Sequence, residues 1–437
     1  MSLLLALGSG VALGVAFLWT WAQPLAWVGI ALLGWALHRA NGWRQAAAAL
    51  LLSALVRQGV ALHWWVGTAE FYTAPWLPPP FIVAFLGWTA TGALSQVPLL
   101  ALAALPVKRV PPRYWLPLGW VLGEAGLEAW SGFSMTHVLH SQWMQPPILR
   151  AVGFVGWVPT LVLCLLAAVC VGEAVALRSR RLLLPAVGVM LALAALPRLP
   201  VADDALQGTG VVHMASSVRV PESVPEATER LIWPESTVRG LQRGTEGRVS
   251  RPEVLEAFDA RLPVPAIAGL MLRTPEGFFN AAAAFDADGR LRETRGKSIL
   301  VPIGERSIFG LQGRGEPLLA SQARPLLSLA GRKVIPLICY EAFSRATALR
   351  GREAGGELLA VLASDLPLAG SRFAMDQAIG GVVMRAVELH MPAVRASLGG
   401  IAVVVSSDGR VLARSAPGAS SILMLSPPPR MVEATQE

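Results

Sequence analysis

The sequence predicts a helical membrane region of several spans, followed by an α/β domain built of layered strands and helices. The chain is 54% hydrophobic and only 15% charged, whereas a soluble protein carries roughly 25% charged residues. Residues 1–37 contain no Asp, Glu, Lys or Arg, and charge becomes frequent from about residue 199 onward. We therefore expect a membrane domain over 1–198, an outer domain over 199–430 and a tail over 431–437.

Seven apolar stretches in the first half are candidates for membrane spans, each of which needs about 20 apolar residues. They lie at residues 3–20, 24–37, 46–66, 80–106, 114–131, 150–176 and 182–198. Because more spans follow the first, that first stretch is expected to be retained rather than cleaved as a signal peptide.

The basic residues of this half predict its orientation. Arg and Lys gather in the connections at 38–45, 107–113 and 177–182, and the alternate connections carry none. Basic loops favour the cytoplasmic side, so seven spans would leave the N-terminus in the cytoplasm and deliver residue 199 to the periplasm. The protein is therefore expected in the inner membrane as a multi-pass protein. The basic connections also account for the net charge of +8. Basic and aromatic residues do not alternate along the chain, so the sequence does not favour nucleic-acid binding.

Polar residues inside the predicted spans are candidates for function, because charge within a membrane is costly. Arg57 lies near the middle of the third span, where it would meet a lipid phosphate or a carboxylate, or form a structural ion pair with Glu124 or Glu128. His137 and His140 near Glu128 show no recognised zinc-ligand spacing, so no metal site is predicted.

The second half alternates short β-type runs with turns and helical stretches, which is typical of a layered α/β domain. Asp-Gly pairs within 285–293 and 406–413 predict hairpins, and apolar spacing over 372–390 predicts a helix. Strands are expected at 209–215, 229–236, 266–272, 278–286, 333–341, 357–364, 392–397, 400–409 and 409–415.

Three chemically active residues end or begin apolar runs in this half: Glu235, Lys297 and Cys339. Cys164 and Cys170 lie in a predicted span, so Cys339 has no partner for a disulfide within its domain. A thiol attacks as the thiolate, a carboxylate can take its proton, and a lysine can stabilise an oxyanion. Together the three would support acyl transfer through a thioester, although their spacing alone does not show that they meet.

These residues lie in motifs that resemble a known family. WPES at 233–236, KSILVPIGE at 297–305 and PLICYE at 336–341 are similar to the three signatures of the nitrilase superfamily. Their longer forms resemble the bacterial apolipoprotein N-acyltransferases, as do the block at 384–411 and PLAWVGIALL at 24–33. The resemblance implies that the outer domain is a nitrilase-like αββα sandwich.

The resemblance also implies roles for individual residues. Glu235 would be the general base, Lys297 would stabilise the oxyanion and Cys339 would carry the acyl group. The supporting residues would be Glu305, Tyr340 and Glu341. The implied reaction takes an acyl chain from a membrane phospholipid and passes it to the α-amino group of a diacylglyceryl-Cys apolipoprotein, with no metal or organic cofactor.

The chain departs from the family's pattern around the expected substrate pocket. ASDLPLAGS at 363–371 lacks the usual Asn-Asp-x-Trp-Phe-Gly, Arg295 stands where a Tyr is often found, and no eighth span is expected after the outer domain. Two alternatives therefore stay open. One is a membrane-anchored nitrilase-like amidase or acyltransferase acting on another exported substrate, such as one linked to a conjugative transfer system. The other is a non-catalytic scaffold.

Overall fold

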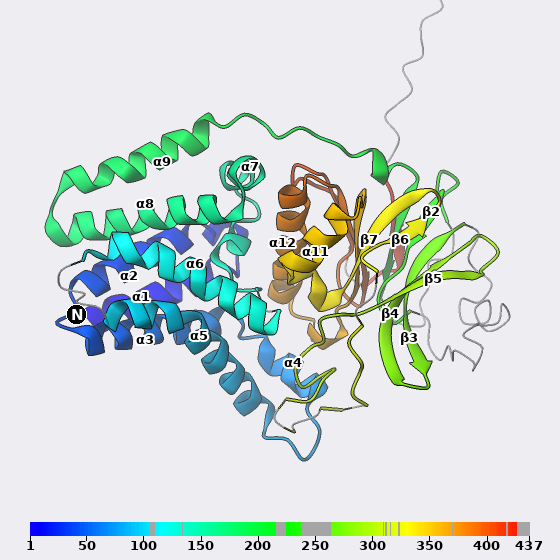
Figure 1. The fold of residues 1–437 in the computed structure, drawn as a ribbon, viewed down its shortest axis with the longest axis horizontal. Coiled ribbons are helices and arrows are strands. Elements are labelled where there is room, and N and C mark those ends of the chain that lie inside the picture. The colour runs from blue at the N-terminus through cyan, green and yellow to red at the C-terminus, as the bar shows by residue number, and fades with distance from the viewer. Residues whose placement is uncertain are drawn as a thin grey trace, which may run out of the picture.

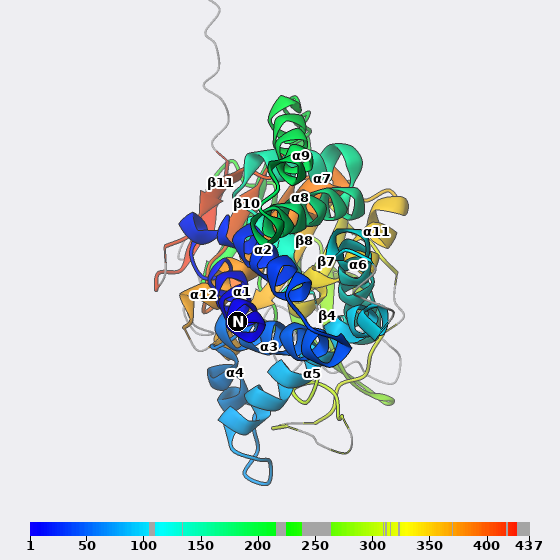
Figure 2. The same cartoon turned by 90° about the vertical axis from the view of Figure 1, so that its left-hand side faces the viewer.

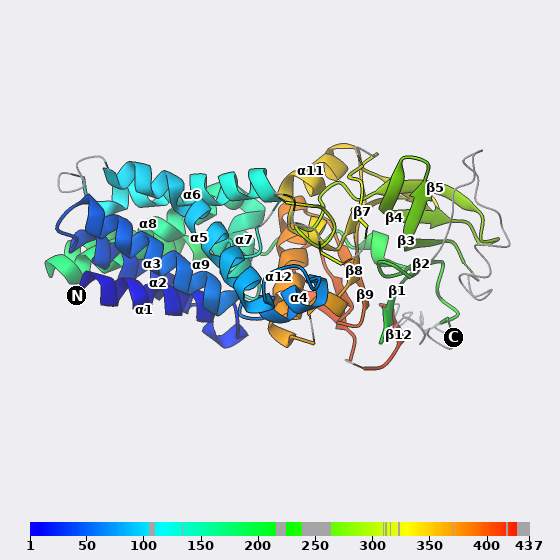
Figure 3. The ribbon, with the colours of Figure 1, turned by 90° about the horizontal axis from the view of Figure 1, so that it is seen from below.

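In the computed structural model, a helical half and a sheet half lie end to end (Figures 1 and 3). The structure describes residues 1–104, 110–132, 134–215, 224–237, 264–308, 310, 313–314, 316–321, 324–368, 370–416 and 418–425. The predicted tail at 431–437 lies outside these residues. Within them, the predicted order of a helical region followed by a layered α/β domain is confirmed.

Every apolar stretch predicted to span a membrane is helical over most of its length. Three helices within Thr20–His38, Pro80–Ala104 and Trp157–Leu177 are long and apolar enough to cross a membrane, and a bent pair, Trp43–Ala61 with Trp65–Tyr72, gives a fourth candidate. The count of seven spans therefore stays a prediction. The helices are α1 (Ser2–Val15), α2 (Leu25–His38), α3 (Trp43–Ala61), α4 (Trp65–Tyr72), α5 (Pro80–Ala104), α6 (Pro112–Ser131), α7 (Pro146–Val155), α8 (Trp157–Leu177) and α9 (Leu184–Ala195).

The sixth predicted stretch, 150–176, is not one continuous helix. It breaks at Gly156, which has φ +87° and separates α7 from α8. Only glycine adopts this backbone region readily, and Pro159 in the first turn of α8 has no N–H that would continue the hydrogen-bond ladder of α7. Because the whole stretch is apolar, its hydrophobicity gave no indication of this break.

The described residues of the second half form one twelve-stranded sheet whose main path runs β5-β4-β3-β2-β1-β9-β8-β7-β6, with β10 and β11 joined to β9, and β12 to β1. The neighbours from β3 through β2, β1, β9 and β8 to β7 pair in parallel. The strands are β1 (Thr209–Met214), β2 (Arg230–Ile232), β3 (Ala266–Thr274), β4 (Gly277–Phe285), β5 (Leu291–Gly296), β6 (Leu327–Leu329), β7 (Arg332–Ile338), β8 (Leu358–Ser364), β9 (Ala393–Leu398), β10 (Val403–Val405), β11 (Val411–Arg414) and β12 (Ser421–Leu423).

The sheet curves until its two ends approach, since β4 contacts β6 and β7. A buried core that includes Val211, Ile267, Val334 and Ala360 fills the space between the two halves of the sheet. Both predicted hairpins are present, as β4–β5 and β10–β11. Because β7, β8 and β2 run in parallel, the segments that follow them emerge at one edge of the sheet, where α/β folds place their chemistry.

Helices α11 (Arg345–Glu353) and α12 (Arg372–Leu389) lie between the sheet and the helical half (Figure 1). Their apolar side chains join one buried core with residues of α2, α8, β7 and β8. Polar contacts also cross the junction: Gln377 donates to the Ala61 carbonyl at 2.8 Å, and the Arg345 N–H donates to Glu128 at 2.7 Å. Viewed from the helical end, the bundle covers α12 and the sheet behind it (Figure 2). The two halves are therefore packed against each other.

Candidate functional site

Glu235 is held at the end of β2 by a close approach of the neighbouring strand. The Gly269 N–H donates to the Pro234 carbonyl at 3.0 Å, and a Cβ on Gly269 would lie 2.4 Å from the Glu235 Cα. Ser236 then turns the chain with φ +56°. The buried carboxylate accepts from the Ser364 N–H at 2.9 Å through Oε2, which leaves Oε1 for the centre of the site.

Lys297 follows β5 directly and is fully buried. Its Nζ lies 2.8 Å from Glu305 Oε1 and 3.4 Å from Glu235 Oε1. Burial alone would lower the pKa of Lys297, but the carboxylates of Glu305 and Glu235 outweigh it and raise that pKa well above its usual value. The lysine is therefore a permanent cation between two carboxylates.

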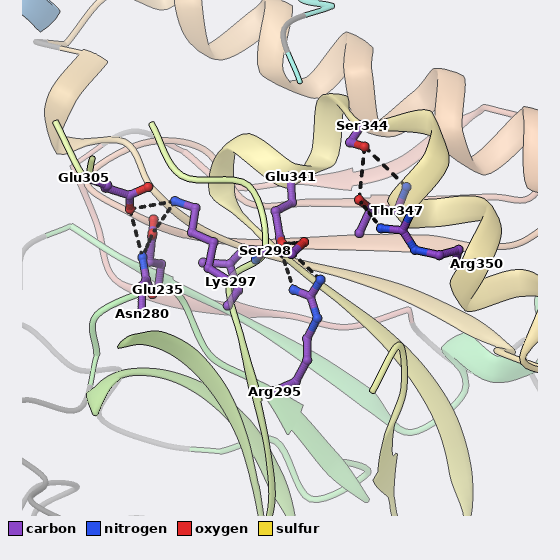
Figure 4. A network of polar contacts seen from close by, with 11 residues as sticks. Glu235, Asn280, Arg295, Lys297, Ser298, Glu305, Glu341, Ser344, Thr347 and Arg350 are labelled. Atoms are coloured by element: carbon purple, nitrogen blue, oxygen red, sulfur yellow. Dashed lines mark hydrogen bonds and ion pairs between the residues drawn. The ribbon is translucent and has the colours of Figure 1, made fainter. Parts of the chain in front are cut away.

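Asn280 of β4 joins the same two carboxylates, and it was not predicted as a site residue. Its Nδ2 donates to Glu235 Oε1 at 2.6 Å and to Glu305 Oε1 at 3.2 Å. Glu305 is fixed in addition by the Val301 N–H at 2.7 Å. The sequence did hold one signal, since Asn280 is the single polar residue in FFNAAAAF. Figure 4 shows the four side chains converging.

Cys339 lies at a sharp turn after β7. Its φ is +49°, a region that non-glycine residues rarely adopt and that often marks a functional site. The side chain is partly exposed. Burial, and then the charges of Glu235 and Glu305, raise the pKa of the thiol, while Lys297 opposes them. At neutral pH the sulfur is therefore protonated and needs a base before it can attack.

Glu341 fixes this turn to the end of β5. Its carboxylate pairs with both terminal nitrogens of Arg295, accepts from the Ser298 N–H at 2.7 Å, and accepts from the Ile338 N–H at 2.9 Å. Burial would raise the pKa of Glu341, but Arg295 and these hydrogen bonds lower it below its usual value. Glu341 thus holds the segment before Cys339 to the strand that carries Lys297.

Two aromatic residues border the site, one from each half of the chain. The Tyr340 ring packs near Phe343, within a cluster of apolar side chains from both halves. Tyr72, at the end of α4, lies against Gly304, where an added Cβ would meet its ring at 2.8 Å. Tyr72 is also within electrostatic range of Cys339, Glu305, Lys297 and Glu235. The helical half therefore contributes a phenol to the site, which sequence reasoning missed because Tyr72 is far from the motifs.

Arg57 and Glu124 lie away from this cluster, inside the helical half. Neither Glu124 nor Glu128 forms an ion pair with Arg57 in the described part of the chain, so the structural ion pair considered for Arg57 is absent there. Instead, its guanidinium lies 5.1 Å from the centre of the Trp120 ring, and the Trp120 Nε1 donates to Glu124 at 2.8 Å. The Trp120 side chain therefore contacts both Arg57 and Glu124. No three His, Cys, Asp or Glu side chains form a metal-ligand set within the described ranges.

Comparison with known proteins shows what the second half of the chain resembles. The family model described as carbon-nitrogen hydrolase matches residues 251–436, a segment that contains Lys297, Glu305 and Cys339 but not Glu235. Among curated proteins, the apolipoprotein N-acyltransferase of Rhizobium leguminosarum bv. trifolii is 24% identical over 218 residues, covering 46% of this chain and 40% of that protein. The enzyme of the same name from Ralstonia nicotianae is 34% identical over 134 residues, covering 27% and 24%.

Solved structures that the chain resembles have lower sequence identity to it. An amidase from Nesterenkonia sp. AN1 is 17% identical, covering 51% of this chain and 92% of its own, with a TM-score of 0.35. A branch 10 nitrilase-superfamily protein from Saccharomyces cerevisiae is 13% identical, covering 49% and 87%, with a TM-score of 0.37.

The chain spans about two fifths of the length of the first curated relatives it matches. Together, the family match and the curated relatives show that this chain is similar to the carbon-nitrogen hydrolases in its second half and to the apolipoprotein N-acyltransferases.

Proposed function

We propose that this chain is a membrane-bound acyltransferase, which takes a fatty acyl chain from a phospholipid onto Cys339 and passes it to the N-terminal amino group of a diacylated apolipoprotein. The observation that carries the proposal is the meeting of Glu235, Lys297 and Glu305 in one buried cluster, within electrostatic range of Cys339 at its turn. The apolar helices packed against the same domain would present lipid substrates to it.

In the first half-reaction, Glu235 takes the proton of the Cys339 thiol as the sulfur attacks the ester carbonyl of the phospholipid. Lys297 donates to the oxyanion of the tetrahedral intermediate. The intermediate collapses to a thioester, and the departing alkoxide of the lysophospholipid receives the proton from Glu235. Glu305 and Asn280 hold the lysine and the base in place throughout.

In the second half-reaction, the α-amino group of the lipoprotein attacks the thioester carbonyl. Glu235 accepts a proton from the attacking nitrogen, Lys297 again stabilises the oxyanion, and the Cys339 thiolate leaves and is reprotonated by Glu235. The product is an amide, and the site returns to its starting state without any cofactor. Tyr340 and Glu341 are proposed to support this chemistry, Glu341 by fixing the turn.

The proposed setting is the inner membrane, with residues 1–198 as the membrane domain and 199–430 as a periplasmic catalytic domain followed by the tail at 431–437. The basic connections predicted to be cytoplasmic support this orientation. A phosphatase fused to the C-terminus of the chain should be active, and a fluorescent reporter that matures only in the cytoplasm should stay dark there. The opposite pair of results would reverse the orientation.

A second function has a specific observation in its favour. Arg295, which stands where the resembling family often has Tyr, pairs with Glu341 beside the site, and this difference favours an acceptor other than a lipoprotein. The alternative is a nitrilase-like amidase or acyltransferase that acts on another exported substrate.

Mass spectrometry of the purified full chain after incubation with phosphatidylethanolamine tests the proposal directly. We expect a fatty-acyl mass on the peptide that carries Cys339, absent from Cys339→Ser. A strain depleted of its own lipoprotein N-acyltransferase should then grow when it expresses the chain. An acyl adduct without growth would favour another acceptor. Amide hydrolysis without an adduct would overturn the lead proposal in favour of the amidase, and no effect of Cys339→Ala would favour a scaffold.

A further inference from the structure

A cavity of about 470 Å³ opens between β5, β7 and α11. Its lining includes Arg295 and Ser298 at the end of β5, Ser321, and Thr347 with Arg350 from α11. None of Glu235, Lys297, Glu305 and Cys339 lines it. Its volume is within the usual range for small-molecule sites. It is therefore a separate cavity beside the candidate active site.

The polar groups around this cavity are mostly hydrogen-bond donors. Arg295 is only 4% exposed, its two terminal nitrogens bind Glu341, and its Nε is buried with no hydrogen-bond partner among the described residues. A buried donor left unpaired is unfavourable, so this atom can take an acceptor that the described residues do not provide.

Arg350 adds a charge that no described acidic residue neutralises. Its Nη2 donates to the Thr347 hydroxyl at 3.2 Å, and in the part of the chain that the structure describes it forms no ion pair. No Asp or Glu is among the residues that line the cavity. Figure 4 shows Arg295 directed to Glu341, and Arg350 directed to Thr347 and Ser344. With Glu341 already balancing Arg295, the described residues that line the cavity leave one positive charge, that of Arg350, without an acidic partner.

We propose that this cavity binds the phosphate group of a phosphate ester. Two guanidinium groups with hydroxyl donors match the several acceptor oxygens of a phosphate, and the volume leaves space for the group that the phosphate carries. Because the Arg345 N–H of α11 donates to Glu128 of α6, the cavity lies near the end of the helical half. The ligand is then either a phospholipid headgroup or a soluble phosphate ester.

Binding in this cavity would also affect the proposed nucleophile, Cys339. Arg295 lines the cavity and binds Glu341, and Glu341 accepts from the Ile338 N–H, one residue before Cys339. An anion that accepts a hydrogen bond from the Nε of Arg295 would hold Arg295, and through it Glu341, more firmly in place. The turn at Cys339 would then be less free to move. We therefore expect phosphate-ester binding to change the rate at which iodoacetamide alkylates Cys339.

Binding to the detergent-solubilised full chain, measured by calorimetry on the Cys339→Ser protein, tests the site without reference to acyl transfer. Two probes are used: sn-glycerol 3-phosphate, and dihexanoylphosphatidylethanolamine below its critical micelle concentration. We expect saturable binding of at least one probe, weakened about tenfold or more in Arg350→Gln, which amounts to about 1.4 kcal/mol. Arg332→Gln is the matched control, because Arg332 is partly exposed, pairs with Glu357 and does not line the cavity.

The two probes separate the possible sources of the phosphate. Tighter binding of the lipid assigns the site to a headgroup, and equal or tighter binding of glycerol phosphate assigns it to a soluble ester. Absence of saturable binding for both probes overturns the proposal, as does an equal loss in Arg350→Gln and Arg332→Gln. Since the protein used lacks the thiol, either result leaves the proposed acyl transfer to be judged on its own test.

Discussion

At the scale of single residues, Asn280 sets the geometry of the two carboxylates. Replacing it with Ala removes hydrogen bonds from Glu235 Oε1 and Glu305 Oε1, which leaves buried acceptors with one partner fewer at a cost of about 1–3 kcal/mol. We expect thioester formation to slow about tenfold or more in Asn280→Ala, as measured by the rate of acyl-Cys339 appearance. Asn41→Ala, in an exposed turn, is the control. An unchanged rate in Asn280→Ala would mean that Asn280 does not contribute to thioester formation.

The protonation of Cys339 gives a second residue-scale prediction. Burial and the Glu235 charge both raise the pKa of the thiol, so its alkylation by iodoacetamide should reach half its maximal rate at a higher pH than for a free thiol. Glu235→Gln removes a negative charge, so that midpoint should shift to lower pH. The same variant should nevertheless form acyl-Cys339 more slowly, because its base is gone. If the rate of alkylation at a fixed pH and the rate of acyl-Cys339 formation both fall, or both rise, in Glu235→Gln, then Glu235 is not the base.

How far the sequence could predict the site also depends on residues. Glu235, Lys297 and Cys339 stand out because each adjoins an apolar run in a recognisable motif. Asn280 and Tyr72 reach the same place only through strand pairing and the packing of the two halves. Such contacts join positions far apart in the chain, so neither local spacing nor composition could indicate them.

At the scale of elements, the turn after β7 depends on the buried pair of Glu341 and Arg295. The lowered pKa of Glu341 means that its contribution to stability is present above its ordinary pKa and is lost as the pH falls through its lower folded value. Glu341→Gln should therefore lower stability by about 3 kcal/mol at neutral pH, since it leaves Arg295 buried without its counter-charge.

Thermal unfolding between pH 7 and pH 3 measures this contribution. The difference between the two proteins should shrink as the pH falls, because the wild-type carboxylate is then protonated as well. Glu293→Gln, on the partly exposed edge strand β5, is the comparison and should change the melting temperature little. A constant difference at all pH values would mean that the charge of Glu341 does not act through Arg295.

Elements differ in how well the sequence predicted them, and strand length explains much of the difference. Long apolar runs such as β3, β7 and β8 were expected at nearly their observed bounds. The three-residue strands β6 and β12 were missed, whereas β2 and β10, which are as short, were predicted as parts of longer β-type runs. In the helical half, composition predicted where apolar helices lie but not the break at Gly156, since hydrophobicity does not report a backbone turn.

At the scale of the whole molecule, the helical half does more than support the sheet. It carries Tyr72 at the end of α4, and the Tyr72 carbonyl accepts from the Arg314 N–H at 2.8 Å, which ties α4 to the loops that follow Lys297. The candidate site is therefore assembled from both halves. A catalytic domain separated from α4 would keep Glu235, Lys297 and Cys339 but would lack one wall of their site.

Tyr72→Phe tests this assembly, because it removes one hydroxyl while keeping the ring that packs against Gly304. If the phenol assists the chemistry at Cys339, acyl-Cys339 should form about tenfold more slowly while the melting temperature stays within a degree or two of wild type. Phe71→Leu, at the exposed neighbouring position on α4, should behave as wild type in both measurements. A normal rate in Tyr72→Phe together with a slow rate in Tyr72→Ala would instead limit the contribution of α4 to packing, since only the ring would then be needed to close the site.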